Sequence, residues 1–137
     1  MKPVFLDTCG LIAALNTRDQ WHVQAKAVWS TLIASNAPLL TTSLVLIELG
    51  DGLARIDQRQ FALDLRAKLL ESPIVEIVTV TTTLEQRGWD LYGNRADKGW
   101  GITDCVSFVL SNDRGIEEAF TADRHFEQAG FKLLLSQ

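Results

Sequence analysis

The sequence predicts an α/β fold: a single domain with a central, mostly parallel sheet of four to five strands flanked by helices. Short apolar runs alternate with longer amphipathic segments along the whole chain. Strands that are buried on both faces read as continuous apolar runs, so this alternation indicates a parallel sheet covered by helices on both sides. The 137 residues fit the usual size of one domain, and a hydrophobic fraction of 47% is enough for one core. Because no linker or low-complexity stretch interrupts the pattern, residues 1–137 are expected to form one domain.

Five short, mostly apolar runs are expected to be the strands. Each lies between helical patterns or turn residues, and each has the length of a buried strand. The expected strands are residues 4–6, 39–41, 74–78, 118–121 and 131–134.

The segments between these runs are expected to be helices, because their apolar residues recur at three- and four-residue spacing. Polar residues that favour helix starts precede several of them: Asp19, Ser43, Thr82 or Thr83, and Thr103 are the expected N-caps. The expected helices are residues 10–16, 20–35, 43–55, 58–71, 83–95 and 104–111. Residues 20–35 and 51–70 carry large apolar residues that either fill the core or offer a surface to a partner: Trp21, Trp29, Leu32, Leu53, Ile56, Phe61 and Leu65.

Composition excludes several classes of protein. A net charge of −4 argues against a broad basic face for nucleic acid, so any RNA recognition must be local or use a partner. No apolar run approaches the roughly 18 residues that span a bilayer, and the stretch before Asp7 is too short for a signal peptide. A cytoplasmic protein is therefore expected. Cys9 and Cys105 have no zinc-type spacing, and soft thiolates are poor ligands for hard cations.

Four acidic residues stand beside apolar runs or at helix starts: Asp7, Glu48, Asp104 and Asp123. A carboxylate in such surroundings loses hydration at a high cost in free energy unless a cation or hydrogen bonds compensate. Asp7 and Asp123 follow expected strands, and ligands of parallel sheets collect beyond the carboxyl ends of the strands. Together the four acids favour one pocket for a hard divalent cation such as Mg²⁺.

Each acid taken alone also has an ordinary explanation. Asp7 suits an Asx-turn after a strand, and Asp104 and Asp123 suit the first turn of a helix. Glu48 suits a solvated helix face. The joint pattern, rather than any single position, favours the metal site.

Four segments that contain these acids resemble the PIN-domain nucleases, and especially the VapC-like toxins of type II toxin–antitoxin systems. The segments are Val4–Thr8, Ser43–Leu49, Gly101–Phe108 and Phe120–Phe126, in the family's order and at family-like intervals. One departure is Ile102, where many relatives have leucine, which is a core substitution that leaves the chemistry alone.

The resemblance implies a PIN-like fold and an endoribonuclease that depends on Mg²⁺ or Mn²⁺. It implies catalytic, metal-binding roles for all four acids: Asp7 and Asp104 as direct ligands, Glu48 as a ligand or a residue that orients water, and Asp123 at a second metal. It also implies three partners: an RNA substrate, a cognate antitoxin that covers the acidic pocket, and a second subunit in a homodimer.

Other polar residues near the four acids are candidates for supporting roles. Thr8, Thr103 and Ser107 could orient carboxylates, although helix caps and backbone hydrogen bonds explain them equally well. A basic, aromatic-bearing loop could grip RNA phosphates and stack a base, or it could be a solvated loop with one anchoring tryptophan. Its candidate residues are Arg87, Arg95, Lys98 and Trp100. The two histidines, His22 and His125, are expected to be surface or packing residues.

Three rival functions remain open at this stage. A PIN-type nuclease of RNA processing would carry the same acids, and a non-catalytic PIN module would usually have lost some of them. A phosphate-signalling receiver also has clustered aspartates, but it expects paired acids after the first strand, where this chain has Asp7 followed by Thr8.

Overall fold

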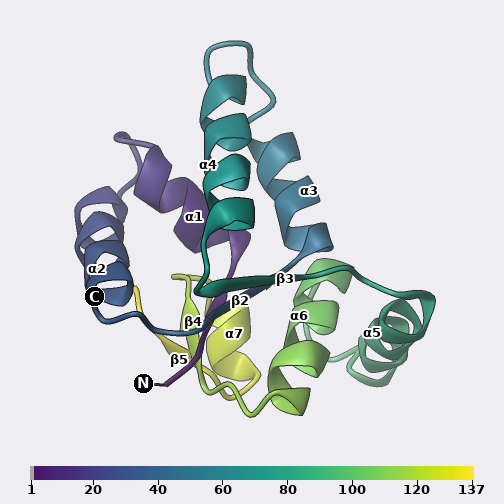
Figure 1. Cartoon of the computed structure of the whole chain (residues 1–137). Coiled ribbons are helices and arrows are strands. Elements are labelled where there is room, and N and C mark those ends of the chain that lie inside the picture. The colour runs from purple at the N-terminus through teal and green to yellow at the C-terminus, as the bar shows by residue number, and fades with distance from the viewer. Residues whose placement is uncertain (1) are drawn as a thin grey trace.

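The computed structural model describes residues 2–137 and contains one sheet of five strands, all paired in parallel (Figure 1). The order across the sheet is β3-β2-β1-β4-β5. This confirms the fold class and the five expected strands. The strands are β1 (Val4–Leu6), β2 (Leu39–Thr42), β3 (Val75–Val78), β4 (Glu118–Phe120) and β5 (Lys132–Leu133).

Seven helices connect the strands. They are α1 (Thr8–Leu15), α2 (His22–Ala34), α3 (Ser43–Gly52), α4 (Arg59–Glu71), α5 (Thr82–Asn94), α6 (Ile102–Asp113) and α7 (Arg124–Gln128). Crossovers between parallel strands are right-handed. From β1 the chain adds β2 and β3 on one side, and after β3 it returns to add β4 and β5 on the other side of β1. Helices α1–α4 therefore cover one face and α5–α7 the other, as Figure 1 shows with α3 and α4 above the sheet and α5 and α6 below it.

The helix starts differ from the expected N-caps by one or two residues. Thr42, not Ser43, caps α3 by accepting from the Val45 backbone N–H at 3.1 Å, and Thr81 caps α5 by accepting from that of Leu84 at 3.1 Å. In both cases the cap is the last residue with extended backbone before the helix, a position that periodicity alone does not locate. Helix α6 begins at Ile102 after Gly101, so the expected cap Thr103 lies inside it.

The start of α2 also differs from expectation. The Asp19 carboxylate accepts from the Trp21 backbone N–H at 2.8 Å, but this bond closes a turn before the helix. Helix α2 itself begins at His22, after Trp21.

The core lies on both faces of β1, whose three residues are all buried. On the α6–α7 side, Phe108 and Phe126 meet edge to face with ring centroids 4.8 Å apart. On the α1 side, Gly10 approaches β4 so closely that a Cβ atom there would collide with the Phe120 carbonyl. This contact fixes the start of α1, and with it Asp7 and Thr8, against the end of β4.

The sheet order creates a crevice between β1 and β4. The connections that leave these two neighbouring strands run to opposite faces of the sheet, which opens a space beyond their carboxyl ends. Asp7 follows β1 and Asp123 follows β4 at this point. Within the described residues, none of the helices is both long and apolar enough to cross a membrane.

Candidate metal centre at the β1–β4 crevice

Asp7 is the most deeply buried of the four predicted acids, with 4% of its surface exposed. Its Oδ2 atom accepts a hydrogen bond from Thr121 Oγ1 at 2.8 Å. Burial raises the pKa of Asp7 to about 7, the Thr121 hydrogen bond opposes that rise, and the nearby charges of Asp104 and Asp123 add to it. The carboxyl group is thus placed where its ionised form costs free energy in the absence of a cation.

Thr121 and Asp123 are held together by the turn that links β4 to α7. Thr121 Oγ1 accepts from the Asp123 backbone N–H at 3.0 Å while it donates to Asp7. Asp123 is the N-cap of α7, and its Oδ1 accepts from the His125 backbone N–H at 2.9 Å. The ordinary explanation for Asp123, helix capping, is therefore correct for one of its oxygens. The same residue nevertheless lies close enough to raise the pKa values of Asp7 and Asp104.

Asp104 reaches the crevice from the first turn of α6. Its Oδ2 accepts from the Gly101 backbone N–H at 3.2 Å, as expected for a carboxylate at a helix N-terminus. Burial raises the pKa of Asp104, and the charge of Asp123 raises it further. Hydrogen bonds from His125 and Gly101 act in the opposite direction without cancelling the rise.

Glu48 lies on α3, on the opposite face of the sheet from Asp104, and is exposed. Its Oε1 accepts from Thr8 Oγ1 at 2.8 Å, and Thr8 follows Asp7 directly. The structure thus brings Asp7, Asp104 and Asp123 together, and it ties Glu48 to the edge of the group through one hydroxyl.

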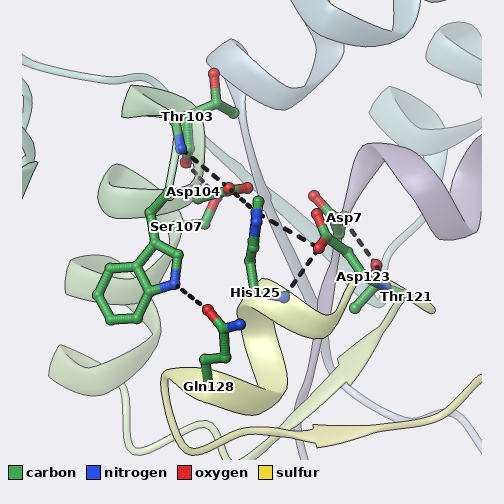
Figure 2. A network of polar contacts seen from close by, with 10 residues as sticks. Asp7, Thr103, Asp104, Ser107, Thr121, Asp123, His125 and Gln128 are labelled. Carbon is green, nitrogen blue, oxygen red and sulfur yellow. Dashed lines mark hydrogen bonds and ion pairs between the residues drawn. The ribbon is translucent and has the colours of Figure 1, made fainter. Parts of the chain in front are cut away.

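His125 is a site residue that the sequence reasoning missed. Its Nδ1 atom lies 3.1 Å from Asp104 Oδ2 and 3.5 Å from Asp123 Oδ1, and Figure 2 shows the ring between these two carboxylates. The available signal was its position two residues after a helix cap, where the first turn of α7 folds the side chain back toward Asp123. His22, in contrast, matches the expectation of packing, because its Nδ1 lies 2.8 Å from the Ala13 carbonyl oxygen.

The three hydroxyl residues predicted to support the acids differ in what their side chains contact. Thr8 bonds to an acid, as described for Glu48. Ser107 donates instead to the Thr103 backbone carbonyl at 2.8 Å, which is the helix-backbone alternative. Thr103 itself is buried, and in residues 2–137 its hydroxyl bonds to none of the four acids. Thr121, which the sequence reasoning did not select, orients Asp7 instead; its signal was a threonine at the end of β4.

The predicted RNA-gripping loop is partly occupied with internal contacts. Trp100 is only 6% exposed and donates its indole N–H to Gln128 Oε1 at 3.0 Å, which agrees with the alternative of an anchoring tryptophan rather than with base stacking. Arg95 lies over that ring at 5.1 Å and pairs with Asp97. Arg87 pairs with Asp113 across α5 and α6. Lys98 takes part in no ion pair among residues 2–137.

The donor set fits a divalent cation. Asp104, Asp123 and His125 each offer one ligand atom, and these atoms all lie within 4.8 Å of one another. Throughout residues 2–137, no lysine or arginine forms an ion pair with Asp7, Glu48, Asp104 or Asp123. The crevice therefore gathers negative charge that only an imidazole and backbone or hydroxyl donors offset, which is the situation that a bound cation relieves.

Comparison with known proteins gives consistent matches over nearly the whole chain. A family model described as "PIN domain" matches residues 4–132. Proteins from two strains of Mycobacterium tuberculosis, both named 23S rRNA-specific endonuclease VapC20, are 29% identical over 130 residues, covering 93% of this chain and 95% of the relative.

Solved structures agree with these matches. The crystal structure of Mycobacterium tuberculosis VapC20, described as a sarcin-ricin loop cleaving toxin, has a TM-score of 0.83 at 30% identity and covers 94% of this chain and 96% of its own. FitAcB from Neisseria gonorrhoeae, at 17% identity, has a TM-score of 0.66 with 95% of both chains covered, and shares the fold.

Proposed function

The chain belongs to the PIN domain family, and we propose that it is an endoribonuclease that requires Mg²⁺ or Mn²⁺ and acts as the toxin of a toxin–antitoxin pair. The similar protein VapC20 carries an endonuclease name and the description of a toxin, over almost the same length of chain. An RNA substrate would place the activity in the cytoplasm. The assignment of residues 1–137 to one nuclease domain stays a prediction.

The observation that carries this proposal is the state of Asp7. A nearly buried carboxyl group with a pKa of about 7 and two acidic neighbours is costly to ionise unless a cation binds it. The neighbouring Asp104 and Asp123 offer oxygen ligands and His125 adds one imidazole, a set that suits Mg²⁺ or Mn²⁺ and a phosphate-bearing substrate.

We assign Asp7, Asp104 and Asp123 to the cation. When bound, a divalent cation polarises a phosphodiester and lowers the pKa of a water molecule, which is the chemistry that RNA hydrolysis needs. The Thr121 hydroxyl orients Asp7 by donating to its Oδ2, and the Gly101 backbone N–H orients Asp104 in the same way. These hydrogen bonds hold the carboxylates in place and leave oxygen lone pairs free for the cation.

Glu48 has a separate part in this proposal. Thr8 holds its Oε1, which leaves Oε2 able to accept a proton from an attacking water at the exposed rim of the crevice. Arg87, Arg95 and Lys98 remain candidate phosphate contacts, since the two arginines are about half exposed and their ion-pair partners are surface carboxylates. Trp100 is not part of this proposal.

An apolar groove between α1, α2 and α4 is the surface that we propose for the antitoxin. It has a volume of about 420 Å³, and Leu11, Trp29, Ile33 and Leu69 are among the residues that line it. Lys26 and Lys68 also border the groove, which suits an amphipathic helix with acidic residues on its edges. A homodimer is proposed from the toxin resemblance alone.

Two rival functions are distinguishable from the toxin. A PIN-type RNA-processing nuclease would cleave a precursor RNA and would not arrest growth. A non-catalytic PIN module would bind RNA without cleaving it, and the presence of all four acids argues against this rival.

The test is a cleavage assay on total RNA, ribosomal RNA and tRNA with Mg²⁺ or Mn²⁺ titrated from zero. We expect cleavage that EDTA abolishes, and a loss of about 10³-fold or more in Asp7→Asn or Asp104→Asn, because the cation site loses an essential charge. Asp97→Asn, a surface aspartate paired with Arg95, is the matched control and should keep full activity. Full cleavage by a folded Asp7→Asn protein would contradict the proposal.

A further inference from the structure

The imidazole of His125 occupies the point where two carboxylates of the proposed metal centre converge. Its Nδ1 atom is 3.1 Å from Asp104 Oδ2 and 3.5 Å from Asp123 Oδ1 (Figure 2). The three groups form the one cluster of metal-ligand type among residues 2–137 that contains a nitrogen donor.

The spacing of these atoms matches the edge of a coordination shell. Adjacent ligands at about 2.1 Å from a metal with octahedral geometry lie about 3 Å from each other. The two distances from Nδ1 are close to this value, so one cation could contact all three side chains with small movements. A hydrogen bond from Nδ1 to Asp104 has the same length, so metal ligation and hydrogen bonding must be separated by experiment.

The surroundings hold the ring in this position. The His125 backbone N–H is bound to Asp123 Oδ1, and the next residue, Phe126, is fully buried in the core. On the other side of the ring, Nε2 lies 3.9 Å from the position that a Cβ atom on Gly99 would occupy. The backbone on the α7 side therefore sets the position of the ring, which presents Nδ1, rather than Nε2, to the carboxylates.

We propose that His125 Nδ1 is a ligand of a divalent cation that it shares with Asp104 and Asp123, and that this nitrogen makes the position selective for first-row transition ions such as Mn²⁺ over Mg²⁺. The proposal rests on the proposed function, whose metal centre it deepens. Imidazole suits transition ions, whereas Mg²⁺ is held by oxygen ligands and keeps several of its waters. An acid-only centre has no comparable preference.

The experiment uses tag-free protein and Mn²⁺ as the probe, with pulsed electron paramagnetic resonance to detect nitrogen coupled to the bound ion. We expect histidine ¹⁴N coupling in the wild type, replaced by a ¹⁵N pattern after labelling with ¹⁵N-histidine. His22→Gln is the matched control, because it removes the other histidine of the chain and should leave the coupling unchanged. The labelling measurement requires no mutation at the site, so it does not depend on the folding of a variant.

Two variants of His125 separate a ligand from a hydrogen-bond donor. His125→Asn keeps a side-chain N–H near Asp104 but provides no nitrogen ligand, and His125→Ala provides neither. We expect both to lose the coupling and to bind Mn²⁺ at least about tenfold more weakly, a loss typical of removing a group at a metal site. Mg²⁺ affinity should change less than about threefold, since oxygen ligands and water hold that ion.

Two results would overturn the inference in distinguishable ways. If Mn²⁺ binds in a manner that requires Asp7 but shows no nitrogen coupling, and His125→Asn binds like the wild type, His125 only donates a hydrogen bond and the nuclease proposal stands. If neither Mn²⁺ nor Mg²⁺ binds and no RNA is cleaved, the proposed function fails together with this inference.

Discussion

At the scale of single residues, Asp7 shows how the same burial that destabilises a carboxylate prepares it for a cation. The side chain has one hydroxyl partner, Thr121, and two like charges nearby. Burial raises its pKa to about 7, the two neighbouring charges add to the rise, and the hydrogen bond from Thr121 opposes it. Near neutral pH the metal-free protein therefore carries a carboxyl group that ionises only at a cost in free energy.

This predicts an unusual dependence of stability on pH for the metal-free protein. Between the unfolded pKa of 3.8 and the folded pKa of about 7, the folded chain holds a proton that the unfolded chain has lost. The free energy of unfolding must then fall as pH rises through that window and level off above it. The contribution from Asp7 is at most roughly 4 kcal/mol, and the raised pKa of Asp104 acts in the same direction.

Urea denaturation in EDTA at several pH values between 4 and 8 measures this effect. Asp7→Asn should flatten the curve and should be more stable than the wild type at pH 8, because the amide carries no charge to desolvate. Asp97→Asn is the control. The hydrogen bond from Arg95 lowers the pKa of the exposed Asp97 carboxyl, so this variant should keep the fall in the free energy of unfolding that the wild type shows. A wild-type curve that rises from pH 4 to pH 7 would rule out this view of Asp7.

At the scale of elements, the site depends on how helices are placed against strand ends. Helix α6 carries Asp104, and it packs against α5 through Gly88, where a Cβ atom would lie 2.5 Å from Val106 Cγ2. Valine is stiff at χ1, so its methyl group cannot move aside without shifting the backbone. The α5–α6 contact therefore needs a residue without a side chain at this point.

Two glycines on α5 form a matched pair for testing this contact. Gly88→Ala should destabilise the protein by about 1–3 kcal/mol through overpacking, even though alanine is the better helix former. Gly93→Ala, on the same helix with open space around its Cβ position, should stabilise by up to about 1 kcal/mol. Thermal or urea unfolding followed by circular dichroism gives both values, and equal effects at the two positions would refute the packing argument.

The groove between α1, α2 and α4 predicts a second pair of variants. Ile33 lines the groove and is 41% exposed, so Ile33→Glu should weaken antitoxin binding about tenfold or more by burying a charge in an apolar contact. Val23, 83% exposed on the same helix and outside the groove, gives the control Val23→Glu. Calorimetry with the cognate antitoxin measures both affinities. Equal losses for the two variants would place the antitoxin elsewhere.

At the scale of the whole molecule, the cation site and the stability of the fold are linked. A cation that binds only the folded chain raises the free energy of unfolding by about 2.7 kcal/mol at 100 times its dissociation constant. For a domain of this size we expect the melting temperature to rise by roughly 5–10 °C when Mn²⁺ is added and to fall again with EDTA. Asp97→Asn should show the same shift, and Asp104→Asn should show little or none. A metal-independent melting temperature in the wild type would argue against a cation at the crevice.

The sequence predicted the sheet well because its strands are short apolar runs with helical patterns between them. All five strands and the order of the six longer helices were expected, and the acids at residues 7 and 123 were correctly placed at strand ends. Helix starts were predicted less accurately. Thr42 and Thr81 cap their helices because their backbone is extended, and the sequence does not distinguish them from the neighbouring hydroxyl residues.

The parts of the site that could not be predicted depend on contacts between distant segments. His125 reads as an ordinary helical histidine until α7 is placed beside α6, which brings it to Asp104. The sequence leaves Trp100 as either a base-stacking or an anchoring residue, and only its contacts with Phe108 and Gln128 favour the second. Neither contact leaves a periodic signal, and the position of His125 two residues after the cap Asp123 does not indicate Asp104.

The pairing of β1 with β4 has a consequence for the time at which the crevice can exist. Asp7 and the hydroxyl of Thr121 that orients it are 114 positions apart in the chain. At a translation rate of about 5–20 residues per second, the ribosome needs roughly 6–23 s to make the second after the first. During that interval β1 has no β4 beside it, so the nascent chain has no complete acidic crevice. A chain that hydrolyses RNA therefore has no complete site until nearly all of its sheet has been synthesised.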